Sequence, residues 1–515
     1  SHPLTYKSQA DTDLAAGVTL TTHHLFTHQP WTTLEPGMTL GYWGLHFERT
    51  QTWWHEINTW NEYLTRAHSM LSKGQPVFDV LHLLGDDSAT TSDKEFALKT
   101  LPEGYDFEFI STDGLMNHVD VNERGQLALE SGRTYNILSI SPDVSMRVEV
   151  LEQIKSLLER GVTVVGLPPT FSPSLEGSFD ISATDGRVHH LADEIWGARF
   201  KSQVFKTLED ALNHKGIQPD VLISHTDNRF VWRHHDVSEE NTDVYFISNL
   251  DQRAAEIELD LRAKGKAVEI WDPLSGKRLL ASDYVVENGR TRFTLHFDQA
   301  QSLFVVLAPQ KSTGKLLNTL SFGQLQVLDS PWQVEFIKGV KKPNALELNE
   351  LIDLSQHANE DVRYFSGTVR YETEFEIADD LPTSPSYLLS LGDAFQFARV
   401  RLNGHDLGLR MWAPYHFDIS NIIRSGENRL EIEVTTLWPN RLIGDERLYP
   451  ETAAWKKNGY QGSQLTSFPK WLKGATPEQP GARSTFATWK HWNKDDELLP
   501  SGLLGPVSIM VQDRN

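Results

Sequence analysis

The sequence contains no cysteine, which excludes disulfides, zinc–thiolate sites and a thiol nucleophile, and removes any redox indication of compartment. No apolar run approaches the ~18 residues that span a bilayer, and "SLFVVLAP" (302–309) predicts only a buried strand. The sequence has 48 Lys and Arg residues and 70 Asp and Glu residues, which gives a net charge of −22. This acidic balance disfavours a nucleic-acid partner, because phosphate neutralisation requires a basic face. The N-terminal "SHPLTYKSQADTD" lacks the basic and apolar regions of a signal peptide.

Several motifs of enzyme chemistry are also missing. The loops carry neither a G-x-G-x-x-G nor a phosphate-binding loop, since each Gly-Lys pair is followed by Ala, Arg or Leu. The sequence has no G-x-S-x-G elbow, and His55-Glu56 is not completed to a zinc-binding H-E-x-x-H. The histidine doublets lack ligand partners at useful spacing and are more typical of loop or core residues than of metal sites. They are His23-His24, His189-His190 and His234-His235.

The 515 residues suffice for about three or four domains of roughly 150 residues each. Between 76 and 238, continuous apolar strands alternate with helical patterns, which predicts an α/β domain with a parallel sheet covered on both faces. Residues 239–312 alternate as short strands and predict a β-sandwich, and a linker leads into a second all-β unit within 313–515. The fold class is therefore multidomain α/β plus all-β.

Residues 1–75 are harder to place as a unit. They predict a helix ending at Gly17, one strand over "VTLTTHHLF" (18–26), and an amphipathic helix that ends near Gly74. One strand cannot form a sheet or close a barrel alone. The pattern predicts the C-terminal end of a larger (β/α) domain whose earlier strands lie outside this sequence.

The segment "HQPWTTLEPGMTLGYWGLHFERTQTWW" (28–54) places four tryptophans among turn residues. Flat aromatic side chains beside polar ones suit a hydroxylated ligand such as a sugar. Trp53 lies on the apolar stripe of the following helix and is expected in the core, whereas Trp31 and Trp43 lie off it. We expect His28, with Trp31 or Trp43, to face a ligand.

Sugar hydrolysis requires two carboxylates that flank the scissile bond. Glu35, Glu48 and Glu56 are the candidates near the aromatic segment. Each has an ordinary structural explanation: a loop surface charge, a partner for Arg49 or Arg66, and an acid at a helix N-terminus. None is assigned a catalytic role.

The block "THQPW....PGMTLGYWGLHFERTQTWW......W..YLTR...ML..G..VFDVL" resembles the end of the catalytic barrel in family 106 of the glycoside hydrolases, the α-L-rhamnosidases. Later blocks resemble this family too, in order along the chain, and the last β unit resembles a galactose-binding jelly roll. They are "LPEGYDFEFIS" (101–111), "VRLNGHDLG" (400–408), "LWPNRLIGDERL" (437–448) and "TFATWKHWNKDDELLPSGLLGPV" (485–507).

The resemblance implies an inverting hydrolase that removes terminal α-L-rhamnose from oligo- or polysaccharides, with calcium on sugar hydroxyls and no organic cofactor. The catalytic glutamates are expected on earlier barrel strands, so none is matched here and the partner of this chain is the missing N-terminal barrel segment. A periplasmic or extracellular location is expected, with neither nucleic acid nor membrane as partner. The substrate-binding residues are expected to be His24, His28, Trp31, Trp43, His46 and Arg49.

The segment "WPNRLIGDE" predicts a polar loop between sandwich strands, in which Asn440, Arg441, Asp445 and Glu446 hold domains together or reach substrate. Two other functions stay open. A non-catalytic carbohydrate-binding or scaffold protein would bind glycan without turnover. A glycosidase of the β-galactosidase type would share the sandwich modules but hydrolyse β-galactosides.

Overall fold

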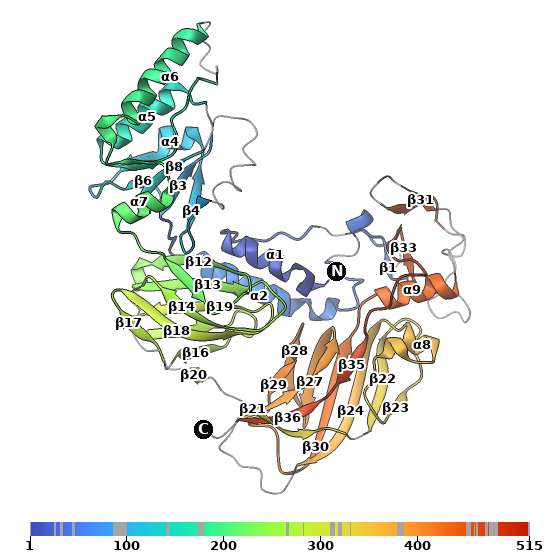
Figure 1. Cartoon of the computed structure of the whole chain (residues 1–515). Helices are drawn as coiled ribbons and strands as arrows, with labels where there is room; N and C mark the ends of the chain where they lie inside the picture. The colour runs from blue at the N-terminus through green and yellow to red at the C-terminus, as the bar shows by residue number, and fades with distance from the viewer. Residues whose placement is uncertain are drawn as a thin grey trace.

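A computed structural model shows the arrangement of the chain (Figure 1). An α/β unit lies at one end, a first β-sandwich with the N-terminal helices on one face lies next to it, and a second sandwich lies at the other end. The structure describes residues 2–24, 27–30, 34–43, 47–85, 100–141, 145–173, 180–263, 267–281, 283–309, 315–317, 322–329, 331–377, 386–449, 455–457, 459, 462–468, 472 and 483–512. Within these ranges, no helix is both long and apolar enough to cross a membrane.

The α/β unit contains a five-stranded sheet in the order β10-β9-β8-β3-β4, and all its pairings are parallel. Its strands are β3 (Val80–Leu83), β4 (Phe107–Ile110), β8 (Ile137–Ile140), β9 (Thr163–Val165) and β10 (Val204–Phe205). Its helices are α4 (Thr112–His118), α5 (Val148–Glu159), α6 (Ile181–Ile195) and α7 (Leu208–Lys215).

Helices cover both faces of this sheet. The face that meets α5 and α6 buries Leu151, Ile154 and Val188, and a separate cluster joins α7 to Val80 and Ile137. The predicted parallel sheet is therefore confirmed. Continuous apolar strands are required because neither face meets water. A small antiparallel sheet follows β4 and consists of β5 (Val119–Val121), β6 (Leu127–Leu129) and β7 (Thr134–Tyr135).

The first sandwich packs a seven-stranded sheet against a four-stranded one. The larger sheet runs β2 (Gln75–Pro76), β12 (Phe230–Val237), β13 (Thr242–Asn249), β19 (Ser302–Ala308), β15 (Ala267–Trp271), β16 (Arg278–Ala281) and β20 (Lys315–Leu317). The smaller sheet runs β11 (Val221–Ser224), β14 (Ala255–Leu261), β18 (Arg290–Phe297) and β17 (Val285–Glu287). Asn288 and Gly289 turn β17 into β18 with φ of 52° and 76°, as an Asn-Gly hairpin predicts.

The second sandwich packs a six-stranded sheet against a four-stranded one. The former runs β23 (Leu346–Leu348), β22 (Trp332–Gly339), β24 (Gly367–Ile377), β30 (Gly426–Thr435), β27 (Phe397–Leu402) and β28 (His405–Arg410). The latter runs β21 (Phe322–Val327), β36 (Ser508–Gln512), β25 (Tyr387–Ser390) and β29 (His416–Asp418). Shorter elements at its edge are α8 (Glu360–Arg363), β26 (Asp393–Phe395), α9 (Pro439–Leu448), β31 (Trp455–Lys457), β32 (Ser463–Leu465), β33 (Phe486–Ala487), β34 (Trp489–Lys490) and β35 (Gly502–Gly505).

Helices α1 (Pro3–Ala15) and α2 (Ile57–Leu71) pack on the outer face of the seven-stranded sheet (Figure 1). The predicted stripe of α2 is buried, with Trp53 and Trp60 each only 1% exposed. Their hydrophobic cluster includes Phe246 and Phe304 from the first sandwich and Phe397 from the second. The N-terminal segment therefore shares its core with both sandwiches instead of enclosing one of its own.

A buried polar cluster fixes α1 in the same place. Lys7 and Asp11 form an ion pair one turn apart, and Lys7 donates to the Ser302 hydroxyl at 3.0 Å. The hydroxyls of Tyr63 and Ser248 both donate to the Asp11 carboxylate. Buried charges require such partners, so α1, α2, β13 and β19 are held in one relative position.

The predicted strand over 18–26 is wrong for the part that the structure describes. Residues 18–24 form coil with exposed side chains, and 25–26 lie outside the described residues. β-branched residues favour an extended backbone, but a strand also needs a neighbouring strand for its N–H and C=O groups. The barrel arrangement predicted for residues 1–75 and the predicted domain boundaries stay predictions.

Candidate functional site

A cavity of about 460 Å³ lies beside α1, between the coil 18–24 and the side chains of Leu40, Trp43 and Phe47. This volume falls in the range of small-molecule sites, about 300–1,000 Å³. The cavity is lined by aromatic and imidazole rings together with one hydroxyl and one aliphatic side chain. They are Tyr6, Thr22, His23, His24, Leu40, Trp43 and Phe47.

Phe47 organises the aromatic wall of the cavity. The His23 ring stacks on it with centroids 4.1 Å apart and planes 24° apart, and Tyr6 lies 5.7 Å away. On its other side, Phe47 meets the edge of Trp53 at 5.9 Å, and Trp53 stacks on Phe397 at 5.7 Å. Since Phe397 belongs to β27, the wall is anchored in the second sandwich.

The cavity favours neutral imidazole. Burial lowers the pKa of His23 below its usual range, and burial also lowers the pKa of His68. The His68 ring is placed against the coil by a 3.1 Å hydrogen bond between its Nε2 and the Thr21 hydroxyl. At neutral pH the His23 ring therefore offers one N–H donor and one nitrogen acceptor, the combination that a hydroxylated ligand needs. The Trp43 indole, 52% exposed, presents a flat apolar surface.

Side-chain hydrogen bonds shape the loop that leads to Trp43. The Gln29 amide donates to the Met38 carbonyl and accepts from the Met38 N–H, both at 2.8 Å. Gly37, directly before Met38, has φ of 84°, and a Cβ on it would lie 2.2 Å from the Gln29 Oε1. Glycine is required at this position both by the backbone conformation and by the close approach of Gln29.

This loop is docked on a C-terminal segment. β1 (Pro36–Gly37) pairs in parallel with β33, and Thr39 N–H donates to the Thr488 hydroxyl at 3.1 Å. The His491 Nε2 and the Thr39 hydroxyl are 3.0 Å apart. A Cβ on Gly41 would lie 3.4 Å from the Trp43 ring and 3.6 Å from the Trp489 ring. Trp489 is therefore a neighbour of the site that sequence reasoning missed, and only its place in the "TFATWKHWN" block marked it.

The predicted polar loop "WPNRLIGDE" is wrong: residues 439–448 form helix α9. Pro439 suits the first turn because proline needs no N–H partner there. The helix is buried over seven consecutive residues, 440–446, and four of them are polar: Asn440, Arg441, Asp445 and Glu446. Each has polar partners inside the protein, so polar character does not indicate a solvent-exposed loop.

Asp445 holds the C-terminal segment to α9. It accepts hydrogen bonds from the Ser484 N–H at 2.9 Å, and from the Thr485 N–H and hydroxyl, both at 2.7 Å. The Arg441 Nη2 lies 2.8 Å from Asp445 Oδ1 without hydrogen-bond alignment, so this contact is mainly Coulombic. Glu446 pairs with Arg483 at 2.7 Å and with Lys490 at 3.1 Å. Of the two predicted roles, these contacts match that of holding segments together.

The structure brings together part of the predicted site. His24 and Trp43 line the same cavity, whereas His28 is exposed on the neighbouring coil. Arg49 is exposed and pairs with Glu48 at 3.2 Å. Trp31 and His46 lie outside the described residues. Ligand binding by any of these residues stays a prediction.

The three glutamates near the aromatic segment have distinct surroundings. Glu48 is buried and accepts from the Thr27 N–H at 2.9 Å and the Arg49 N–H at 3.0 Å, which ties both ends of the aromatic loop together. Glu56 pairs with Arg399 of β27 at 3.2 Å. Glu35 is only partly exposed, and burial raises the pKa of its carboxyl, so it is less of a surface charge than predicted.

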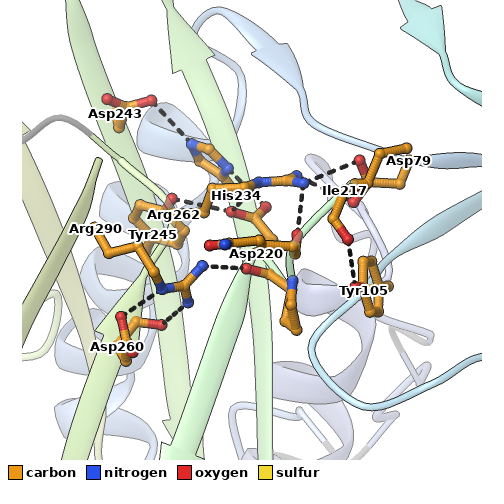
Figure 2. Close-up of polar contacts among 12 residues, drawn as sticks. Asp79, Tyr105, Ile217, Asp220, His234, Asp243, Tyr245, Asp260, Arg262 and Arg290 are labelled. Carbon is orange, nitrogen blue, oxygen red and sulfur yellow. Dashed lines mark hydrogen bonds and ion pairs between the residues drawn. The ribbon is translucent and has the colours of Figure 1, made fainter. Parts of the chain in front are cut away.

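A second polar cluster joins the α/β unit to the first sandwich (Figure 2). The His234 Nδ1 lies 2.8 Å from Asp220, and its Nε2 lies 3.1 Å from Asp243. Burial opposes the charge on His234, but the two carboxylates outweigh it and raise its pKa to about 9. Arg262 reaches Asp79 at 3.0 Å across the junction. These groups satisfy one another, which is the arrangement of a structural ion cluster.

The resemblance implies calcium, which oxygen ligands such as Asp and Glu carboxylates would hold. Among the described residues, no group of three or more His, Asp or Glu side chains is placed to hold a metal ion. The histidine doublet His234-His235 is used structurally, since His235 contacts the Lys73 carbonyl at 2.9 Å. Calcium on sugar hydroxyls stays a prediction of the resemblance, and no step is assigned to the ion.

The cavity is walled by aromatic and imidazole rings and belongs to a chain with two β-sandwiches. A family model described as alpha-L-rhamnosidase, glycoside hydrolase family 106, matches residues 1–284, more than half of the 515. The chain therefore belongs to this family. A model of the glycosyl hydrolase 2 galactose-binding domain-like family matches residues 346–465 within the second sandwich.

Two longer proteins are similar to nearly the whole chain. A solved rhamnosidase from Novosphingobium sp. PP1Y is 27% identical with a TM-score of 0.83, over 99% of this chain and 46% of that one. A curated Formosa agariphila protein named "Putative beta-glucuronidase" is 25% identical, over 99% of this chain and 62% of its own length. The chain thus spans about half to three fifths of the proteins it matches.

Proposed function

We propose that this chain is the C-terminal portion of an α-L-rhamnosidase that hydrolyses terminal α-L-rhamnose from glycans with inversion. We assign the catalytic acid and base to barrel strands upstream of this sequence. These strands belong to the N-terminal barrel segment that the resemblance implies as the partner of this chain. The aromatic cavity supports the proposal most directly, because it places rings and neutral imidazole together in a family of rhamnoside hydrolases.

Each lining group has a role in this proposal. Rhamnose is a 6-deoxy sugar, so its methyl group and C–H face are apolar while its ring hydroxyls are not. Trp43 packs against the apolar side, and His24 with Thr22 exchanges hydrogen bonds with hydroxyls. The resemblance assigns sugar contacts to His28, Trp31, His46 and Arg49 as well.

Sugar binding is tested separately from hydrolysis. Ligand-observed NMR of the 515-residue chain with methyl α-L-rhamnoside is expected to show binding that Trp43→Ala weakens by about tenfold, since an aromatic face contributes about 1–2 kcal/mol. Phe171→Ala is the matched control, because it removes an exposed ring, 42% exposed, from the α/β unit. Equal affinity for both variants would contradict a role for the aromatic cavity.

Hydrolysis is tested by adding a separately expressed upstream barrel segment to the chain with an aryl α-L-rhamnoside. We expect turnover only with both parts present. The alternative, a non-catalytic carbohydrate-binding protein, is favoured by the galactose-binding-like match over residues 346–465. It predicts rhamnoside binding with no turnover under either condition.

A further inference from the structure

A second cavity, of about 400 Å³, lies between the C-terminal half of α2 and the hairpin that joins β15 to β16. Its floor is apolar, with Met70 and Phe304 buried and Trp271 half-buried. Thr65 and Ser69 place hydroxyls at its rim. The volume accommodates one or two sugar rings.

The charge of this cavity is opposite to that of the protein. The chain carries a net charge of −22, yet the cavity has one carboxylate, Asp272, among its lining residues. Its cationic lining residues are Arg66, Lys73, Lys277 and Arg278. Such a reversal of local charge concentrates anions in the cavity.

The single carboxylate offsets only part of this positive charge, one Asp against four cationic side chains, and its oxygens bond within its own turn. Asp272 Oδ1 accepts from the Leu274 N–H at 2.8 Å, and Oδ2 accepts from the Ser275 hydroxyl. Arg66 is also committed: it pairs with Glu62 at 2.8 Å and donates to the Leu274 carbonyl at 2.9 Å. Asp272 and Arg66 therefore shape the hairpin that forms one wall.

Lys73, Lys277 and Arg278 remain available. Within the part of the chain that the structure describes, none of the three forms an ion pair, and all three are exposed. The Arg278 guanidinium lies 3.7 Å above the Trp271 ring, and the Trp271 N–H is fixed by a 2.8 Å bond to Glu269. Three uncompensated charges in one concavity repel each other, and a bound anion removes that repulsion.

We propose that this cavity binds an anionic sugar residue, one that carries a carboxylate or a sulfate ester, in the glycan that the enzyme degrades. The two ammonium groups and the Arg278 guanidinium, held flat by Trp271, meet the anion. The hydroxyls of Thr65 and Ser69 meet those of the sugar. The choice of a glycan as ligand rests on the proposed function, whereas the preference for an anion rests on the cavity alone.

The test is calorimetric titration of the 515-residue chain with trigalacturonate, a sulfated carrageenan tetrasaccharide and neutral cellotriose. We expect binding of at least one anionic probe, weakened by added salt, and no comparable binding of cellotriose. The double variant K73E/K277E is expected to lose at least about tenfold in affinity. K201E/K206E changes net charge equally at exposed positions of the α/β unit, and its affinity should stay within about twofold of wild type.

The two anionic probes separate the two chemistries, because stronger binding of one assigns the site to carboxylate or to sulfate. Equal binding of cellotriose, or equal losses in the two double variants, overturns the inference. Failure of both anionic probes while methyl α-L-rhamnoside still binds at the aromatic cavity overturns only this inference. Loss of rhamnoside binding with retained trigalacturonate binding overturns only the proposed function.

Discussion

Replacing Asp445 by Asn tests whether α9 organises the aromatic cavity from a distance. Asn can direct its carbonyl oxygen to the donors of Ser484 and Thr485, but its NH₂ group then faces the Arg441 guanidinium, which has only donors. Arg441 and Asp445 are 1% and 0% exposed, so the arginine is left as a buried charge without a partner. Breaking one side of such a pair costs about 3–5 kcal/mol.

The loss is expected to be local. Residues 483–491 are held to α9 through Asp445, and loop 34–39 is held to these residues through β1–β33 pairing and Thr488. With about 3 kcal/mol lost, backbone amide hydrogens of this segment should exchange with solvent on the order of 100-fold faster by mass spectrometry. The affinity for methyl α-L-rhamnoside should also fall, because Trp43 follows loop 34–39 in the chain and depends on it for its position.

Asp251→Asn is the matched control. It removes a carboxylate that pairs at 3.0 Å with Arg229, whose side chain is 71% exposed, so less than about 1 kcal/mol is expected. If Asp445→Asn leaves exchange of 483–491 within twofold of wild type, Asp445 does not hold this segment and the reasoning fails.

Two further predictions concern the junction of Figure 2 and the loop turn. The folded pKa of His234 is raised to about 9, so its stabilisation is complete below the ordinary 6.5 and is lost as pH rises through 9. Thermal unfolding should therefore show the free energy of unfolding falling by on the order of 3 kcal/mol between pH 6.5 and pH 9. His234→Gln should remove most of this pH dependence. An unchanged pH dependence in the variant would contradict the role given to His234. Gly37→Ala should destabilise the loop by about 1–3 kcal/mol, because φ is 84° and the new Cβ meets Gln29. Faster amide exchange of residues 29–39 checks this, with Gly132→Ala as control, since its φ of 88° is equally strained but nothing lies within 4 Å of its Cβ.

Much of the fold follows from periodicity in the sequence. The stripe that includes Trp53 and Trp60, the parallel strands of the α/β unit, and the Asn-Gly hairpin at 288–289 all agree with the structure. These features depend on contacts within a few residues or on the alternation of buried and exposed positions. The strand predicted over 18–26 failed because extended propensity does not supply a neighbouring strand.

The candidate site was predicted only in part, because some of its contacts join residues that lie far apart in the sequence. Trp43 and His24 could be singled out because they lie in or beside an aromatic, turn-rich segment, but their neighbour Trp489 lies more than 400 residues away in the chain. Helix α9 was missed because four of its seven consecutive buried residues are polar, and hydropathy patterns detect only apolar burial.

The sequence by itself determined the parallel strands of the α/β unit, the buried stripe of α2, the absence of thiol chemistry and the family resemblance, because each depends on composition or on the pattern of residues along the chain. Only the tertiary structure decided that Trp43 and Trp489 are neighbours, that Asp445 holds a distant segment, and that Lys73, Lys277 and Arg278 line one cavity. These contacts depend on how separate sheets and helices pack against one another. That packing is determined by the shape and charge of the surfaces that meet, which no short stretch of sequence contains.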